Sequence, residues 1–318
     1  MKAAVVGAGM AGVTIARQLQ KQGVEVTVFD KSKGTGGRLS SRSWNGGWID
    51  HGSPYVTARS NAFAQYLEQS LPGAVVQLWD VEISGSPAAD EWPGYIGCPR
   101  NSSITRGLLG DIGFQPATRI ARLERSGSGW ELYNDGESLL GRWDLVISAV
   151  PAPQVLPLVR ELPQMAAAVR KVRMEPCWVA ALQLDGTLPG IAKIVVAPHP
   201  ALRRIILNSA KPGRNNEHLY LVQATSDWSE KHLEVAPGEA GTMLRDLFAA
   251  TFSIPSVPEL LFAHRWRYAF AEAPLDQDYL WSPSDHFGIC GDWCRGRTVE
   301  DAWSSAMTLA EQICRDLG

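Results

Sequence analysis

The chain is poor in the motifs that signal metals or disulfides. Its five cysteines are scattered through 318 residues without a C-x-x-C pair, and its six histidines form neither an H-x-x-x-H nor an H-E-x-x-H motif. A disulfide framework, a thiolate zinc site and a histidine-based metal centre are therefore not expected. We instead predict buried, reduced thiols in a cytoplasmic protein.

Net charge and long apolar runs are also lacking. The formal net charge is −3, which provides no general attraction to nucleic acid or to an anionic membrane. No apolar run reaches the roughly 18 residues of a membrane span. Glycines interrupt the apolar N-terminus, so we assign it to the fold and not to a signal peptide. A Ser-His-Asp arrangement in a known motif context is absent too, which leaves a hydrolase without support.

The first 30 residues predict a dinucleotide-binding unit. A short apolar strand at residues 3–6 leads into the glycine-rich G-A-G-M-A-G, a helix and a second strand that ends at Asp30. Gly7 permits a tight turn, Gly9 lets the backbone approach a pyrophosphate, and Gly12 lets the helix pack closely. The helix N-terminus favours phosphate, and Asp30 is placed to accept both ribose hydroxyls.

The residues after Asp30 favour FAD over NAD. Gly36-Gly37-Arg38 follows six positions later and suits a cofactor that continues beyond the first pyrophosphate contact. Arg38 can donate two hydrogen bonds to phosphate oxygens or reach the flavin end. A glycine turn with a solvated arginine is the alternative interpretation.

A second cofactor contact is predicted near the C-terminus. An apolar strand at residues 287–290 ends in Gly291-Asp292, where the acid is placed to hold a ribityl hydroxyl. Thr298 is a suitable N-cap for a closing helix, whose amides and positive dipole would stabilise negative charge on a reduced flavin. A closing amphipathic helix without a ligand is the alternative.

The middle of the chain predicts an antiparallel sheet with helices on one side. It contains four β-rich runs, at 179–184, 194–197, 204–207 and 219–223, and two helical segments, at 162–171 and 239–251. Before them, residues 119–124 and 130–135 indicate two strands around a polar turn, and residues 145–150 indicate a parallel strand.

Three segments together resemble the flavin amine-oxidase superfamily, and within it most closely the renalases: VVGAGMAG, FDKSKGTGGR and DHGSPYV. The resemblance continues at residues 119–120, 143–151, 264–268 and 289–292. It implies an α/β fold, with a Rossmann-like FAD-binding domain and a second α+β substrate domain built on an antiparallel sheet, like the amine oxidases and p-hydroxybenzoate hydroxylase. We assign residues 1–75, 99–151 and 266–318 to the FAD-binding domain, and residues 76–98 and 152–265 to the substrate domain.

The same motifs imply non-covalent FAD, because the cysteine motif of the covalently flavinylated members is missing. The expected FAD contacts lie in the glycine-rich motif, after the second strand, in the third segment, near the adenine side and in the C-terminal segment. They are Gly7, Gly9, Met10, Ala11, Gly12, Asp30, Lys31, Gly37, Arg38, Gly52, Ser53, Pro54, Tyr55, Ile120, Asp292, Glu300 and Ala302.

The resemblance also implies a reaction. Renalases oxidise 2- or 6-dihydro-NAD(P) to NAD(P)⁺ and reduce O₂ to hydrogen peroxide, so the expected partners are a dihydronicotinamide dinucleotide and O₂. No protein residue is assigned a catalytic role, because the flavin accepts the hydride. An oxidase of a small amine and a non-catalytic, FAD-binding regulatory module remain alternatives. The lysine that reaches flavin N5 through a water in many amine oxidases has no recognisable motif here.

Aromatic side chains are the candidates for the substrate cavity, since the chain holds 12 tryptophans and an aromatic face can stack on a nicotinamide ring. Taken singly, each of them is more often part of a core. The expected cavity residues are Tyr55, Trp178, Asn208, Trp228, Trp266 and Tyr268.

Overall fold

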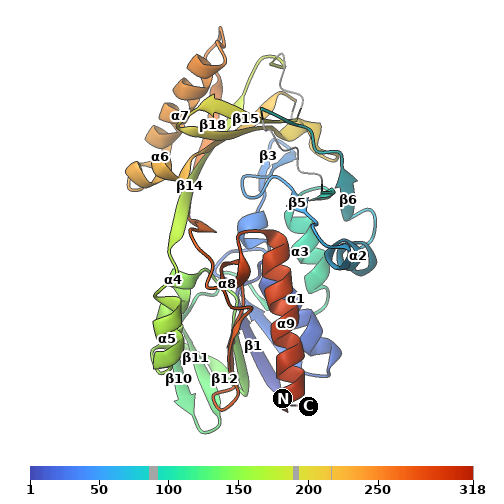
Figure 1. Ribbon diagram of the computed structural model, residues 1–318, viewed down its shortest axis with the longest axis vertical. Coiled ribbons are helices and arrows are strands. Elements are labelled where there is room, and N and C mark those ends of the chain that lie inside the picture. The colour runs from blue at the N-terminus through green and yellow to red at the C-terminus, as the bar shows by residue number, and fades with distance from the viewer. Residues whose placement is uncertain (86–91, 189–192, 216, 318) are drawn as a thin grey trace.

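The computed structural model describes residues 1–85, 92–188, 193–215 and 217–317. Two domains are stacked along its long axis, each built on a six-stranded sheet (Figure 1). The sheet of the lower domain has the order β19-β20-β13-β1-β2-β9. The sheet of the upper domain, the roof sheet, has the order β18-β14-β17-β16-β15-β7.

The lower sheet is mainly parallel: β1 pairs with β2 and β13, β2 with β9, and β13 with β20, whereas β19 is antiparallel. Residues 3–6 of β1 are buried, as expected for a strand covered on both faces. The strands predicted at residues 3–6, just before Asp30, at 145–150 and at 287–290 are confirmed within one or two residues. The bounds are β1 (Lys2–Val6), β2 (Glu25–Phe29), β9 (Gly113–Gln115), β13 (Leu145–Ser148), β19 (Leu280–Ser282) and β20 (Phe287–Ile289).

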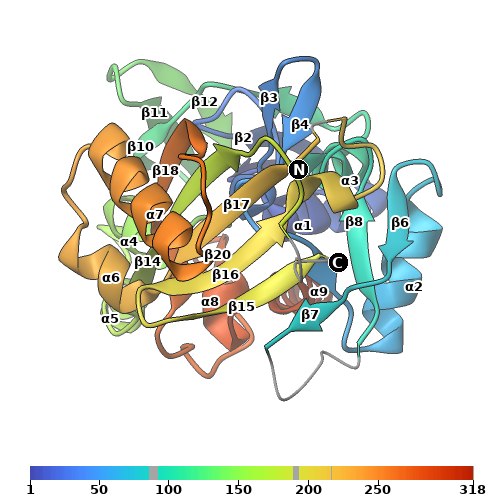
Figure 2. The same ribbon diagram turned by 90° about the horizontal axis from the view of Figure 1, so that it is seen from above.

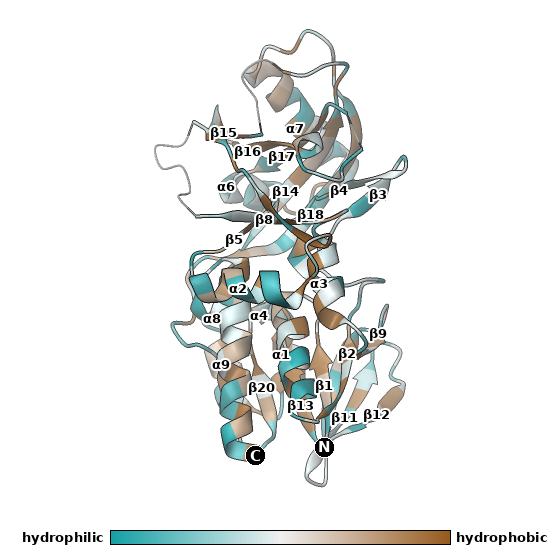
Figure 3. Ribbon diagram, turned by 90° about the vertical axis from the view of Figure 1, so that its right-hand side faces the viewer, coloured by the Kyte–Doolittle hydropathy of each residue, from teal (hydrophilic) through white to brown (hydrophobic). Residues whose placement is uncertain are grey.

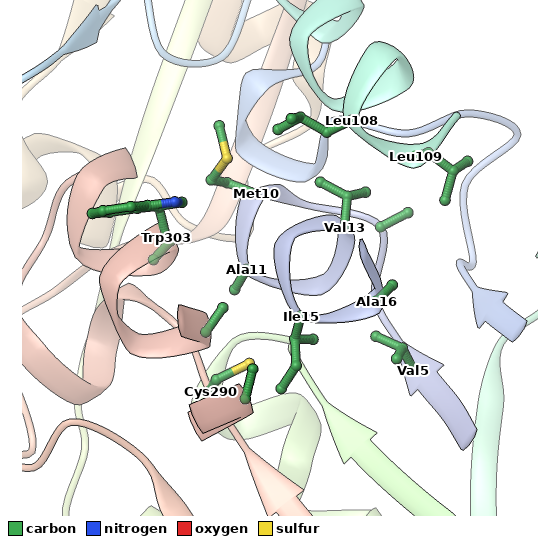
Figure 4. Packing of buried hydrophobic residues seen from close by; sticks show 14 of the residues in the cluster. Val5, Met10, Ala11, Val13, Ile15, Ala16, Leu108, Leu109, Cys290 and Trp303 are labelled. Atoms are coloured by element: carbon green, nitrogen blue, oxygen red, sulfur yellow. The ribbon is translucent and has the colours of Figure 1, made fainter. Parts of the chain in front are cut away.

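Helix α1 (Met10–Lys21) connects β1 to β2 and packs between α9 (Val299–Leu317) and α3 (Ser102–Leu109). Figure 4 shows Met10 and Val13 of α1 near Trp303 of α9 and Leu108 of α3. The hydropathy colouring in Figure 3 shows the apolar strands of the lower sheet behind these helices.

The start of α9 confirms the N-cap predicted at Thr298. The Thr298 hydroxyl accepts a hydrogen bond from the Asp301 amide at 3.2 Å, and the Asp301 carboxylate accepts one from the Thr298 amide at 2.9 Å. This reciprocal pair resembles a capping box.

A small antiparallel sheet lies beside the parallel sheet. It holds the two predicted strands, β10 (Ile120–Ser126) and β11 (Gly129–Asn134), and a third that the sequence did not indicate, β12 (Leu139–Trp143). Helices α4 (Ala152–Val155) and α5 (Pro163–Val169) then lead to the upper domain.

The roof sheet carries α6 (Ser226–Lys231) and α7 (Pro237–Thr251) on one face, as the view from above shows (Figure 2). The predicted antiparallel sheet is thus confirmed, and the helix expected at residues 239–251 is α7 on its outer face. The helix expected at residues 162–171 is α5, but it packs in a core of the lower domain with Ala4 and Val6, and the second helix on the sheet, α6, was not predicted. Its strands are β7 (Ile83–Ser84), β14 (Met174–Gln183), β15 (Ile194–His199), β16 (Leu202–Leu207), β17 (Leu219–Ala224) and β18 (Glu259–Ala271).

The two faces of the roof sheet contribute to different cores. Trp178 and Ala180 of β14 belong to the core under the helices, whereas Cys177 and Val179 belong to a core that also contains Tyr55 from the first part of the chain. The alternation follows from the two-residue period of a strand. The second face is therefore the one that meets the lower domain.

The longest strands, β14 and β18, join the two domains. Their paired ends Met174 and Ala271 pack in a core of the lower domain with Ala4 and Val6, and their upper parts lie in the roof sheet. The predicted boundary between residues 265 and 266 consequently falls inside β18, because residues 266–271 continue the same ladder with β14.

Residues 76–98 are divided between two sheets. Strand β7 joins the edge of the roof sheet, but β8 (Gly94–Gly97) pairs with both β5 (Val56–Thr57) and β6 (Val76–Trp79) in a separate sheet beside α2 (Asn61–Ser70). Residues 86–91 of this predicted segment lie outside the described residues. No helix in the described ranges is long and apolar enough to cross a membrane.

Candidate active site

The glycine-rich turn has the geometry that a phosphate-binding loop requires. Gly7 adopts φ +109°, which few other residues tolerate, and a Cβ on Gly12 would lie 1.8 Å from the Gly7 carbonyl oxygen. A Cβ on Gly9 would meet nothing nearer than 4.0 Å, and no side chain caps α1. The first turn of α1 therefore keeps its amides, including those of Met10 and Ala11, available to an anion.

Asp30 lies at the carboxyl end of β2, beside this turn. Its Oδ2 accepts a hydrogen bond from the Ala8 amide at 2.8 Å, and its Oδ1 accepts one from the Ser32 amide at 2.7 Å. These bonds orient the carboxylate and leave each oxygen with a further lone pair. Neighbouring Lys31 has its pKa lowered, first by burial and then by Arg119.

Arg38 and Asp292 were predicted as separate cofactor contacts, and the structure brings them together. The guanidinium pairs with both carboxylate oxygens of Asp292, including a 2.7 Å bond from Nη1 to Oδ2, and Nη1 also donates to the Ala269 carbonyl at 3.1 Å. Asp292, at the start of α8 (Asp292–Arg295), is only 2% exposed. The pair thus links the short 3-10 turn at residues 37–39, α8 and strand β18.

The segment of residues 50–55 is fixed between the two domains. The Ser53 amide donates to the Arg38 carbonyl at 2.8 Å, and the Asn101 side chain donates to the carbonyls of Ser53 and Pro54 at 2.9 and 3.0 Å. From above, Gln223 of β17 donates to the Gly52 carbonyl at 3.4 Å. The segment in which the family resemblance implies FAD contacts therefore lies directly beneath the roof sheet.

His51 is the centre of an aromatic group on this side of the roof sheet. Its ring stacks on Trp266 with 5.4 Å between centroids, and His264 lies 4.8 Å away and Phe262 5.9 Å away. The Trp266 indole donates to the His51 carbonyl at 2.9 Å. Nδ1 of His51 is buried and has no hydrogen-bond partner among the described residues.

Both imidazoles of this group are held neutral. Burial, with a further contribution from His264, lowers the pKa of His51 to about 4. Burial also lowers the pKa of His264, and the nearby Arg42 guanidinium acts in the same direction. At neutral pH the ring system under the roof is therefore uncharged and weakly basic.

Asp50, the residue before His51, forms a buried ion cluster with Lys211 and Arg214. Its Oδ2 accepts from Lys211 Nζ at 3.0 Å and from Arg214 Nη2 at 2.5 Å, and its Oδ1 accepts from Ser41 and the Asn101 amide. Burial acts to raise the pKa of Asp50, but the two cations outweigh it and hold that pKa below its usual value. Lys211 and Arg214 follow β16, so the cluster ties the upper domain to the lower one.

The predicted cavity residues divide into two groups. Tyr55 and Trp266 share the core between the domains, and Tyr268 lies where the β14–β18 register shifts. Trp178 and Trp228 are corrected: both lie in the core under α6 and α7, on the far face of the roof sheet. Periodicity revealed that β14 is a strand but not which of its faces the helices cover.

Asn208, the remaining predicted cavity residue, has structural partners of its own. It is fully buried, its amide nitrogen donates to the Trp48 carbonyl at 2.9 Å, and its oxygen accepts from the Asp50 amide at 3.3 Å. Both polar groups thus hold the chain that leads into the residue 50–55 segment.

Three further predicted FAD contacts have structural partners of their own. Glu300 accepts hydrogen bonds from the backbone amides of Arg59 and Ser60 at the start of α2. Ala302 packs in the core around α1 and α9, and Ile120 packs beside the end of β2. These contacts position α9 and β10 next to the glycine-rich turn.

Sequence reasoning missed His51 as a side chain, although it included the segment that contains it. It also missed Lys211 and Arg214, because their partner Asp50 is more than 150 residues away and only the tertiary fold joins them. The one available signal was Asp50, the first residue of the DHGSPYV segment. A carboxylate that becomes buried requires a cationic partner, so a distant lysine or arginine was to be expected.

Comparison with known families agrees with this geometry. Residues 5–70 match the model of the NAD(P)-binding Rossmann-like domain, and residues 112–314 match the model of flavin containing amine oxidoreductases, which covers more than half of the chain. The chain belongs to the flavin-containing amine oxidoreductases. It is therefore an FAD-dependent oxidoreductase with a Rossmann-like domain and an amine-oxidase domain.

Three proteins illustrate what this flavoenzyme is similar to. A 56-residue stretch is 41% identical to 4,4'-diapophytoene desaturase from Staphylococcus aureus, and it covers 18% of this chain and 11% of the relative. A crystal structure from Exiguobacterium sp. 255-15, provisionally assigned as a protoporphyrinogen oxidase, has a TM-score of 0.76 at 12% identity over 99% of this chain and 98% of its own. An oxidoreductase from Methanosarcina mazei has a TM-score of 0.71 at 17% identity, over 98% of this chain and 100% of its own. These structures share the fold.

The described residues fit FAD. The side-chain-free Gly9 and the uncapped N-terminus of α1 suit a pyrophosphate, and Asp30 has lone pairs left for ribose hydroxyls. When bound, FAD supplies the two-electron acceptor of the reaction. Within the described ranges, no group of three or more histidine, cysteine, aspartate or glutamate side chains is arranged to hold a metal ion.

Proposed function

We propose that this flavoenzyme oxidises isomeric dihydro-NAD(P), with hydride leaving the 2- or 6-position of the ring and O₂ being reduced to hydrogen peroxide. The observation that carries the proposal is the neutral aromatic group of His51, His264 and Trp266 beneath the roof sheet. Such a surface can stack on a flat heteroaromatic ring.

The chemistry of this substrate matches a site without a strong base. Its reacting carbon already carries a transferable hydride, and loss of that hydride restores an aromatic ring, so no proton needs to be removed in the same step. His51 suits this task because a pKa of about 4 makes it a poor general base at neutral pH. The contribution of the chain is to orient the ring and to exclude water.

Anaerobic reduction of the bound flavin tests the proposal. The 2- and 6-dihydro isomers of NAD(P) are mixed separately with the loaded enzyme, and small primary amines are mixed in parallel. We expect the isomers to bleach the flavin rapidly and hydrogen peroxide to form when air is admitted. Bleaching by an amine alone would replace this function with that of an amine oxidase. A fully loaded protein that no candidate reduces would favour a regulatory module.

We also propose that FAD is held non-covalently. Cys290 and Cys294, at the end of β20 and in α8, are fully buried, and burial raises the pKa of Cys294 to about 12, so neither is a ready nucleophile. Acid precipitation is expected to release the yellow flavin into the supernatant. Colour that stays in the pellet would contradict this proposal.

A further inference from the structure

A second group of charges lies beneath the roof sheet, around Phe270 of β18. The Cζ atom of Arg203 lies 4.2 Å from the centre of the Phe270 ring, and the Cζ atom of Arg297 lies 5.4 Å from it. Arg204 follows Arg203 on β16. We call Arg203, Arg204 and Arg297 the arginine cluster.

The arginine cluster lies on the face that meets the lower domain. Phe270 packs on the same core as Trp266 and Tyr55. Arg204 is directly opposite Gln223 in the β16–β17 ladder, and opposite residues share a face. Gln223 donates to the Gly52 carbonyl, so this face is the one above residues 50–55. Successive residues of a regular strand point to opposite faces of the sheet. A register shift in β16 between Leu202 and Arg204 interrupts this alternation where the two arginines follow each other.

The charges of the cluster are not balanced. Glu175 pairs with Arg297 and also accepts a hydrogen bond from the Ser226 hydroxyl at 3.0 Å. In the described part of the chain, no carboxylate forms an ion pair with Arg203 or Arg204. Burial is the largest cause of the lowered pKa of Arg203; Arg204 and Arg297 act in the same direction, and Cys177 and Glu175 oppose them without cancelling the effect. The guanidinium groups of Arg203 and Arg204 thus have no carboxylate partner among the described residues. Both side chains are half-buried, where an unpaired charge raises the free energy of the folded protein.

The cluster is also close to the predicted cofactor contacts. Phe270 follows Ala269, whose carbonyl accepts the hydrogen bond from Arg38. Arg297 precedes Thr298, the N-cap of α9. A ligand held by the cluster would therefore extend from the region where Arg38, α8 and α9 meet.

We propose that Arg203, Arg204 and Arg297 form an anion-binding subsite for a phosphate or carboxylate group of the substrate. This inference rests on the proposed function only for the identity of the substrate. If the substrate is a dihydronicotinamide dinucleotide, the anion bound at the subsite is its pyrophosphate. A guanidinium fork binds either group through two hydrogen bonds, so the two sources share one chemistry and an experiment separates them.

The test is calorimetric titration of the FAD-loaded enzyme with two probes, inorganic pyrophosphate and glutarate. We expect at least one to bind, with an affinity that decreases as NaCl is added. Arg203→Gln and Arg204→Gln are each expected to weaken binding roughly 10- to 100-fold, and Arg203→Lys to weaken it less than Arg203→Gln. Arg245→Gln, which removes the same charge from α7 on the far face, serves as the control and binds like the wild type.

The outcomes distinguish the two proposals. Preference for pyrophosphate supports a nucleotide substrate, and preference for glutarate supports a carboxylate substrate, with the subsite intact in both cases. Binding of neither probe, or equal binding by both glutamine variants and the wild type, overturns the subsite. If the probes bind but dihydronicotinamide isomers fail to reduce the flavin, the proposed function fails and the subsite stands. The thermal midpoint and flavin content of each variant identify one that has misfolded, and the other variant then decides.

Discussion

The two charged clusters beneath the roof sheet differ in how their charges are satisfied. In the buried ion cluster, both oxygens of Asp50 are bonded, to two cations, a hydroxyl and a backbone amide, with no exposed side-chain area on the three ions. In the arginine cluster, Arg203 and Arg204 are half-buried and have no carboxylate partner among the described residues, whereas Arg297 is exposed and pairs with Glu175. The first arrangement fastens the domains together, whereas the second leaves binding capacity for a ligand.

The largest effect on the free energy of unfolding is expected when the buried ion cluster is broken. Asp50→Ala leaves Lys211 and Arg214 buried without their counter-charge, which should cost about 3–5 kcal/mol of unfolding free energy. Urea denaturation followed by circular dichroism measures it. Asp246→Ala, which removes the exposed partner of Arg245, should cost less than about 1 kcal/mol. Similar losses in the two variants would contradict the role of the buried ion cluster in fastening the domains together.

Asp30 is intermediate between the clusters, because its oxygens are bonded to amides but retain lone pairs for a ligand. Asp30→Ala should remove two charge-assisted ribose bonds of roughly 1.5–3 kcal/mol each. FAD affinity should then fall by orders of magnitude while the protein stays folded. Fluorescence titration of the apoprotein measures this, with Asp111→Ala, an exposed change in the same domain, as control. An affinity within about threefold of the wild type would disprove the assignment.

His51 differs from both charged clusters because it is buried as a neutral side chain, and this makes the stability of the protein depend on pH. Its pKa of about 4 lies below the ordinary value of 6.5, so between these values the unfolded chain binds a proton that the folded protein does not. Stability should therefore decrease as the pH falls, by about 2 kcal/mol between pH 7 and pH 5. His51→Phe keeps an aromatic ring against Trp266 and should remove this part of the loss. Denaturant titrations at pH 7 and pH 5 measure the free energy of unfolding of both proteins. An equal decrease in wild type and variant would contradict the assignment of this pH dependence to His51.

The smallest effects are expected from the uncharged aromatic group itself. Trp266→Ala should weaken substrate binding by about 1 kcal/mol through the lost stacking. The rate of flavin reduction should be nearly flat between about pH 6 and 9, and His264→Gln or His232→Gln should hardly change it. Anaerobic stopped-flow measurements test both statements. A steep pH profile that disappears in one histidine variant would contradict a mechanism without a general base.

Local patterns in the sequence were enough to predict the dinucleotide-binding unit. The strand before Gly7, the helix of α1 and the N-cap at Thr298 all depend on contacts within a few residues, so their chemistry can be read from neighbouring positions. The family resemblance in turn predicted a second sheet above the cofactor.

Features that depend on distant contacts were not accessible in the same way. The apolar runs identified β14, but whether Trp178 faces the helices or the lower domain depends on how α7 folds back onto the sheet. The pairing of Arg38 with Asp292 joins positions 254 residues apart. Each of these residues was recognised as important, but its partner could not be named from spacing alone.

The long ladder of β14 and β18 has a mechanical consequence. One end of the ladder packs in the lower domain and the other end lies in the roof sheet, so the ladder forms a rigid connection between the two domains. A hydrogen-bonded strand pair resists bending far more than a loop does, so hinge opening of the domains should be restricted on this side. Substrate exchange would then depend on small rearrangements of side chains at the rim, and the distance between the domains should be the same before, during and after turnover.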